Sequence, residues 1–345
     1  MSTASCTLVL GLLAVAGLLM PFQSAQGADL PDTVFNTDDV VSVIGGELSE
    51  PDDWPFMVAL VSQSVFGRAQ ADRQFCGGTL IAPRWVLTAA HCMFDIRDNL
   101  LEPSSMRVVA GVTDLRRGQA VVEVVVTNII LHSLYEQQSI AAYDDIALLE
   151  LATAIDEPVV ELFTEDIEVR SGQFATIIGW GATEYGAGGQ SATYPDKLHQ
   201  AIVPLVSRAQ CNAPESYNGL IIDRQLCAGY VDGGVDTCVG DSGGPLLVNE
   251  NGRTQQAGVV SYGKGCAESN YYGIYTNVAK YQTWVSEFID AVDSGSANTG
   301  DDTGTNGQPR GPATIDQGTS RSGSGAGLGL AGLLLSILLG RRLAR

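Results

Sequence analysis

A serine flanked by glycines is the residue whose setting best supports covalent chemistry. Ser242 lies in the string GDSGGP, residues 240–245. A serine hydroxyl is a weak nucleophile until a neighbouring base takes its proton and nearby donors stabilise the oxyanion that forms. The flanking glycines would let the backbone turn so that the amide N–H groups of Gly240 and Ser242 point at one spot. A bare Gly-Asp-Ser-Gly string is also typical of an ordinary turn, so this string leaves two interpretations open.

The base would come from one of three histidines. His91 follows an apolar stretch, residues 85–87, and precedes Cys92, a residue that could hold its loop. His132 and His199 lie among ordinary strand and loop residues, where a packing or surface role is the usual one. We therefore predict that His91 is the base.

A carboxylate must also orient the histidine and stabilise its protonated form. Asp145 begins the string DIALL, residues 145–149, which is typical of an apolar strand. A charge that enters such a strand needs a partner, because burying it alone is costly. Asp144 is the alternative candidate, although a solvated turn residue is the usual role for an aspartate in its place. We predict Asp145 for this position.

The composition predicts the framework that must hold these residues. The chain has 345 residues, of which 45% are hydrophobic and 40 are glycine, and this favours a β-rich, loop-rich fold. Strands are expected at residues 106–111, 120–131, 174–179 and 256–261, and a helix at residues 281–292 would close the domain. The formal charge of -20 argues against a nucleic-acid partner, because phosphate binding needs clustered Lys and Arg.

Seven cysteines are present, and Cys6 lies in a segment that is expected to be removed. The chain has no CxxC pair and few histidines, which argues against a zinc site, and we expect no metal or cofactor. Disulfides formed in an oxidising compartment are the better interpretation, although the number of cysteines leaves their pairing open. The cysteines available are Cys76, Cys92, Cys211, Cys227, Cys238 and Cys266.

Both ends of the chain differ from its middle. Residues 1–27 contain a short apolar run followed by small residues, which predicts a secretory signal peptide, with a membrane anchor as the alternative. Residues 28–42 are acidic and would form a propeptide. Residues 293–324 are rich in Gly, Ser, Thr and Asp and predict a disordered linker. Residues 325–345 are apolar with a basic end and predict a membrane segment whose arginines stay in the cytoplasm, with a buried core helix as the alternative.

Three strings in this chain resemble the signature motifs of the trypsin/chymotrypsin family, peptidase family S1. They are TAAHC at residues 88–92, DIALL at residues 145–149 and GDSGGP at residues 240–245, in the order of that family. The strings CGGTLI, GWG and CAG, at residues 76–81, 179–181 and 227–229, also match, and the resemblance covers residues 43–290. It implies an all-β fold, a double six-stranded antiparallel β-barrel with a C-terminal helix, with His91, Asp145 and Ser242 in the cleft between the barrels. It also implies the pairings Cys76–Cys92, Cys211–Cys227 and Cys238–Cys266.

The same resemblance implies a pocket that selects the residue before the cleaved bond. Asp236 matches the base of this pocket, where an aspartate selects Arg or Lys in trypsin-like members; a turn residue is the alternative role. Gly263 and Gly273 match the two wall positions, where the lack of a side chain leaves room for a long cation. Ser261 belongs to the neighbouring substrate-binding segment.

Activation by cleavage is a further implication. Asp241 matches the carboxylate that pairs with the new amino terminus, and the string VIGG makes Val43 that terminus. Trypsin-like zymogens mostly carry Arg or Lys before the cut, whereas this chain has Ser42. A trypsin-like enzyme would not cut efficiently there, so either another activating protease acts on the chain or the segment is trimmed in another way.

The tail resembles a GlyGly-CTERM sorting signal, with Ser-Gly-Ser-Gly at residues 322–325 in place of two adjacent glycines. This implies processing by an intramembrane protease, and a GPI-addition signal is the alternative. Together the features predict a trypsin-like serine endopeptidase, secreted or tethered at the cell surface, made as a zymogen and cutting proteins or peptides after Arg or Lys. The alternatives are a non-catalytic binding or adhesion member of the same fold, and a peptidase with another primary specificity.

Overall fold

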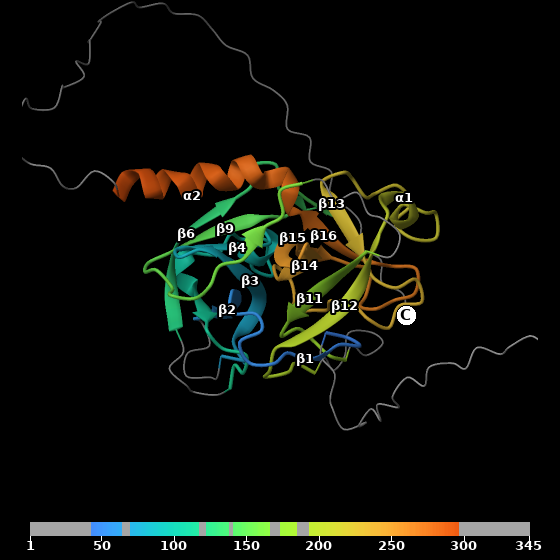
Figure 1. Cartoon of the computed structure of the whole chain (residues 1–345), viewed down its shortest axis with the longest axis horizontal. Helices are drawn as coiled ribbons and strands as arrows, with labels where there is room; N and C mark the ends of the chain where they lie inside the picture. The colour runs from blue at the N-terminus through green and yellow to red at the C-terminus, as the bar shows by residue number, and fades with distance from the viewer. Residues whose placement is uncertain are drawn as a thin grey trace, which may run out of the picture. The chain divides into compact units, whose positions relative to one another are not determined.

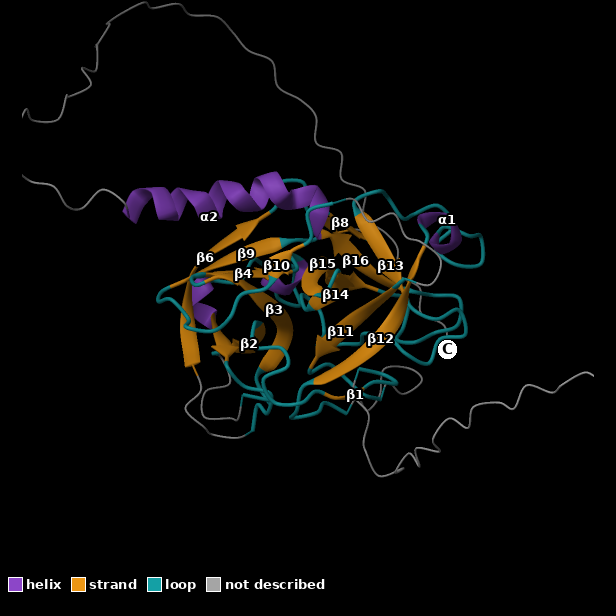
Figure 2. Cartoon of the chain, viewed as in Figure 1, coloured by secondary structure: helices purple, strands orange, loops and turns teal. Residues whose placement is uncertain are grey.

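A computed structural model describes residues 43–63, 70–116, 122–137, 141–165, 173–184 and 193–296. These residues form two closed barrels of mostly antiparallel strands, which lie side by side (Figures 1 and 2). The predicted signal peptide, propeptide and C-terminal membrane segment lie outside the described residues, as does the predicted linker beyond Ser296.

The first barrel closes in the strand order β2-β3-β4-β9-β6-β5. Its interior is aliphatic, with Leu60, Leu87 and Leu148 fully buried. Branched and aliphatic side chains suit a pleated surface that is packed on one face, which is why these runs form strands. The bounds are β2 (Met57–Ser62), β3 (Gln74–Ala82), β4 (Trp85–Thr88), β5 (Met106–Ala110), β6 (Val122–Leu131) and β9 (Ala147–Leu151).

The second barrel follows the order β12-β11-β14-β15-β16-β13 and closes where β13 pairs with β12. Val43, Ile177, Leu246 and Tyr275 belong to its core. Two short strands, β1 (Glu47–Leu48) and β10 (Glu161–Leu162), add to β12 and β15. The bounds are β11 (Phe174–Gly179), β12 (His199–Val206), β13 (Gln225–Ala228), β14 (Pro245–Glu250), β15 (Arg253–Tyr262) and β16 (Gly273–Asn277).

Short elements lie between or after the barrel strands. They are the hairpin of β7 (Glu136–Gln137) and β8 (Ala142–Tyr143), the 3₁₀ turns η1 (His91–Met93), η2 (Pro103–Ser105) and η3 (Val278–Tyr281), and the one-turn helix α1 (Arg208–Cys211). Ser207 caps α1 by accepting a hydrogen bond from the amide of Gln210, as serine commonly does at a helix start.

The C-terminal helix α2 (Gln282–Ser296) lies along the first barrel (Figure 1). Val285 is buried in the core of that barrel, and the rings of Phe288 and Trp85 are 6.3 Å apart. The helix continues to Ser296, beyond residue 292 where the sequence predicted its end. Within the described ranges, helices are too short or too polar to cross a membrane.

The structure confirms the predicted fold class and the four predicted strands, which correspond to β5, β6, β11 and part of β15. It also contains the three disulfides that the resemblance implied, Cys76–Cys92, Cys211–Cys227 and Cys238–Cys266. Closing such loops stabilises a fold by about 2–4 kcal/mol each.

Candidate active site

His91 and Asp145 are brought together by the pairing of β4 with β9. Thr88 at the end of β4 pairs with Ala147 at the start of β9, so the residues just outside these strands become neighbours. The Nδ1 atom of His91 lies 2.8 Å from Oδ2 of Asp145, and the backbone amide of His91 donates to Oδ1 at 2.9 Å. The carboxylate therefore fixes both the ring and the backbone of the histidine.

Asp145 is fully buried and has two further partners from the second barrel. The Ser261 hydroxyl donates to its carboxylate at 2.5 Å, and the Thr276 hydroxyl donates to its backbone oxygen at 2.8 Å. Burial alone would raise the pKa of Asp145, but the charge of His91 and the hydrogen bonds hold it below the ordinary value. Burial alone would lower the pKa of His91, but the charge and hydrogen bond of Asp145 outweigh it, so this pKa is raised.

Strand β3 joins the loop that carries Ser242 to the segment that carries His91. The amide of Gly77 donates to the carbonyl of Ser242 at 2.8 Å, and Cys76, the residue before it, is bonded to Cys92, the residue after His91. The next residue, Gly243, has a φ of 79°, and any side chain there would collide with Thr88 and with the carbonyl of Gly77. The glycine is therefore required for the nucleophile loop to approach β3 this closely.

The predicted oxyanion donors lie in the same loop. Gly240 is buried with a φ of 101°, and the Nε2 atom of Gln74 donates to its carbonyl at 2.8 Å. Within the described ranges, the amide N–H groups of Gly240 and Ser242 have no protein acceptor. Two such amides in one loop can receive a ligand oxygen.

Asp236 is buried beside Gly273, one of the two predicted wall glycines. Its carboxylate, 5% exposed, accepts from the amides of Thr237 and Ala267 at 2.8 and 3.1 Å. A Cβ added to Gly273 would lie 2.8 Å from Oδ1 of Asp236, whereas one added to Gly263 would meet nothing nearer than 3.6 Å. A side chain at Gly273 would therefore cover the carboxylate. Among the described residues, Asp236 has no Lys or Arg partner, and burial raises its pKa to about 7.

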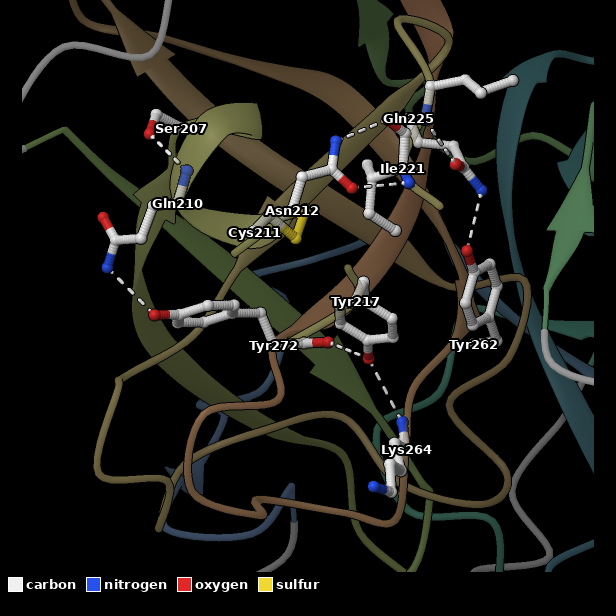
Figure 3. Close-up of a disulfide and its surroundings, with 12 residues drawn as sticks. Ser207, Gln210, Cys211, Asn212, Tyr217, Ile221, Gln225, Tyr262, Lys264 and Tyr272 are labelled. Atoms are coloured by element: carbon white, nitrogen blue, oxygen red, sulfur yellow. Dashed lines mark hydrogen bonds between the residues drawn. A yellow bond between two sulfur atoms is a disulfide. The ribbon is translucent and has the colours of Figure 1, made fainter. Parts of the chain in front are cut away.

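A cluster around the Cys211–Cys227 disulfide supports both walls (Figure 3). The Tyr217 hydroxyl accepts from the amide of Lys264 at 3.2 Å and donates to the carbonyl of Tyr272 at 2.7 Å. Lys264 follows Gly263, and Tyr272 precedes Gly273. One phenol thus connects the backbones of the two walls.

The two residues predicted for activation are both buried in the second barrel. Val43 belongs to its core, and Ile44 forms a backbone bridge with Asp236. The Asp241 carboxylate is completely buried and accepts from the amides of Gly181 and Cys238 at 2.8 and 2.9 Å. Burial raises the pKa of Asp241 to about 6.

Asp144 differs from its expected role as a solvated turn residue. It is only 3% exposed, and the guanidinium of Arg224 binds it through two hydrogen bonds of 2.8 and 2.9 Å. The expectation failed because the partner lies in the other barrel, where no local pattern reveals it. Sequence reasoning likewise missed Gln74 and Tyr217, whose partners also lie far away along the chain.

The other histidines have packing roles, as expected. The ring of His132 lies edge-on to Tyr281 and Trp284, and His199 is buried with its Nδ1 atom 2.8 Å from the carbonyl of Lys197. Cys76, His91 and Cys92 form the one close group of potential metal ligands within the described ranges. Both sulfurs are in a disulfide, which removes the thiolates that would bind a metal.

The sequence of this chain is similar to that of a known protein family. The sequence model of the trypsin family matches residues 43–285. The chain belongs to the trypsin family of serine proteases. This trypsin-family chain is 38% identical over 251 residues to human transmembrane protease serine 5, covering 71% of the chain and 51% of that protein. It is 34% identical over 260 residues to coagulation factor XII of Cavia porcellus, covering 71% and 40%. The chain thus spans about half the length of these relatives or less.

Proposed function

We propose that the chain is a serine endopeptidase with Ser242 as its nucleophile, His91 as its general base and Asp145 as the orienting carboxylate. The buried contact between His91 and Asp145, next to the loop that carries Ser242, is the observation that supports this most. A histidine whose Nδ1 is held by a carboxylate presents Nε2 as the basic atom.

The reaction follows from these roles. Ser242 Oγ attacks the carbonyl carbon of the peptide bond while His91 takes its proton, and the tetrahedral oxyanion binds the amides of Gly240 and Ser242. The protonated His91 then gives its proton to the leaving amine, which departs and leaves an acyl-enzyme. His91 next takes a proton from the water that attacks the ester, and then gives it to Ser242 Oγ as the carboxylic acid leaves.

A serine-directed fluorophosphonate tests this assignment. The processed protein should take up one label per molecule, at Ser242. Its hydrolysis of ester substrates should be lost at the same rate as the label is incorporated. Ser242→Ala should abolish both labelling and turnover, whereas Ser286→Ala, at an exposed serine of α2, should leave both unchanged. Unchanged hydrolysis by Ser242→Ala would contradict the assignment, and a complete lack of hydrolysis by every form would favour the binding alternative.

We also propose cleavage after Arg or Lys. A buried carboxylate without a cation beside it has a desolvation cost that a substrate guanidinium or ammonium would relieve. Gly273 leaves Asp236 uncovered, and a side chain added at Gly263 would meet nothing nearer than 3.6 Å. Arg and Lys esters should therefore be cleaved far faster than Phe or Leu esters. Faster cleavage after Phe would contradict the role of Asp236 and leave the catalytic roles intact.

Activation at Val43 is the third part of the proposal. The uncut chain gives Val43 a φ of 47°, a left-handed conformation that β-branched residues rarely adopt. A free amino terminus has no preceding carbonyl, so cleavage before Val43 would remove this unfavourable conformation. It would also add a positive charge near the buried Asp241 carboxylate. With Ser42 before the cut, trypsin should fail to activate the wild-type chain, whereas Ser42→Arg should make it trypsin-activatable. Activation of the wild type by trypsin at another bond would refute Val43 as the terminus.

The remaining proposals concern the site of action. Three disulfides fit an oxidising compartment, and one relative is named as a transmembrane protease. We propose that residues 1–27 direct export and that residues 325–345 hold the chain at the cell surface until an intramembrane protease cuts the tail. Terminal sequencing of protein from the medium and from membranes tests this. Membrane-bound chains that retain residue 1, or medium protein that retains residue 345, would contradict it.

A further inference from the structure

Asp144, the residue before Asp145, is an acidic side chain for which the proposed reaction has no role. It is 3% exposed and has a φ of 51°, in the left-handed region that aspartate and asparagine tolerate better than other side chains. Its carbonyl accepts from the amide of Ile146 at 2.9 Å, which closes a tight turn around Asp145. The conformation of Asp144 therefore sets the direction in which the Asp145 side chain leaves the backbone.

Side chains from two other parts of the fold hold the Asp144 carboxylate. Arg224, just before β13 in the second barrel, donates from Nε to Oδ1 at 2.8 Å and from Nη2 to Oδ2 at 2.9 Å. The Tyr281 hydroxyl, from η3, donates to Oδ1 at 2.9 Å. His132, just after β6, has its Nδ1 atom 3.9 Å from the same oxygen. A two-point guanidinium contact fixes the plane of a carboxylate, which a single donor cannot do.

The Arg224 contact also joins the two barrels behind the catalytic residues. Asp145 and His91 belong to the first barrel, whereas Ser242 belongs to a loop of the second. We infer that Asp144, clamped by Arg224, is a positioning residue that holds Asp145, and through it His91, in register with Ser242. This inference rests on the proposed function. It adds a further connection between the barrels to the hydrogen bonds that Ser261 and Thr276 donate to Asp145.

The test uses Arg224→Gln and Asp144→Asn in a full chain that also carries Ser42→Arg, activated by immobilised trypsin that is then removed. Asparagine keeps the tolerance for a left-handed φ but loses the charge, and glutamine cannot make the two-point contact. We expect kcat for an arginine ester to fall by about tenfold to a hundredfold in either variant, with KM nearly unchanged, because small misplacements of catalytic groups have effects of this size. Arg224→Lys should recover only part of the loss.

If Asp144 and Arg224 only stabilised the fold, the substitutions would lower the amount of folded protein without changing the chemistry of the molecules that remain folded. Two readouts separate the cases. The acid limb of kcat/KM, normalised by active-site titration, should move to lower pH, because the raised pKa of His91 depends on Asp145. The proton NMR signal of the His91 Nδ1–H group should shift or broaden. Arg253→Gln, which removes an exposed ion pair with Glu161, serves as the matched control and should change neither.

The outcomes are distinguishable. Wild-type values for the acid limb and the Nδ1–H signal in both variants would overturn the positioning role, even if both variants unfold more easily. If the unsubstituted chain hydrolyses nothing, the proposed function fails. The NMR signal still decides the positioning of His91 in that case, because it requires no turnover.

Discussion

Replacing Asp236 with asparagine tests the specificity pocket through stability as well as activity. The carboxylate is buried, bonded by two backbone amides and, among the described residues, has no Lys or Arg beside it. Burial raises its pKa from an ordinary 3.8 to about 7. Because the folded-state pKa is the higher one, ionisation weakens the fold. The stability of the protonated form is fully present below pH 3.8 and is lost as the pH rises through about 7.

The size of the effect follows from the shift. A difference of this size in pKa corresponds to about 4 kcal/mol once the group is fully ionised. Asparagine has the same shape and no charge, but its amide nitrogen cannot accept from one of the two backbone amides, which costs about 1 kcal/mol. We therefore expect Asp236→Asn to raise the free energy of unfolding by about 3 kcal/mol at about pH 8.5, and to lower it by about 1 kcal/mol at about pH 4.

Urea unfolding followed by tryptophan fluorescence measures this, with both chains carrying Ser242→Ala so that neither digests itself. Asp232→Asn, at an exposed aspartate in the same loop, is the control and should show no pH-dependent difference. In the active chain, Asp236→Asn should lower kcat/KM for arginine esters by about 10⁴, as expected when a buried polar contact to substrate is lost. A stability difference that is the same at both pH values would show that Asp236 is not desolvated, and would refute the reasoning.

Three further predictions concern the site. The acid limb of kcat/KM should lie above pH 6.5, the ordinary pKa of histidine, because the reaction needs neutral His91 and the pKa of His91 is raised. An acid limb below pH 6.5 in a series of rate measurements would contradict the contact with Asp145. Tyr217→Phe removes both hydrogen bonds between the pocket walls and should raise KM for arginine esters by about tenfold, with a smaller change in kcat. A larger change in kcat than in KM would contradict this role of Tyr217. Gln74→Ala frees the carbonyl of Gly240 and should lower kcat by about tenfold, whereas unchanged kcat would show that the loop needs no support from β3.

The strings around His91, Asp145 and Ser242 could be predicted from the sequence because each one encodes local chemistry. Glycines flank a serine that must sit in a tight turn, and an aspartate begins an apolar strand. Strands such as β6 and β11 were also predictable, since branched side chains recur along them. The end of α2 at Ser296 was not, because the residues after 292 carry little apolar pattern by which to judge a helix end.

Partners that lie far apart along the chain can be found only from the tertiary structure or from a known set of motifs. Asp144 and Arg224 are 80 residues apart, and His91 and Asp145 are 54 apart. The second pair was predictable because it belongs to a set of motifs with a known order, whereas nothing near Asp144 indicates that it is buried. The sequence by itself determined which residue types could do chemistry and the family to which they belong. Which charges are buried, and what holds them, depended on how two closed barrels pack, because desolvation and long-range hydrogen bonds exist only after that packing.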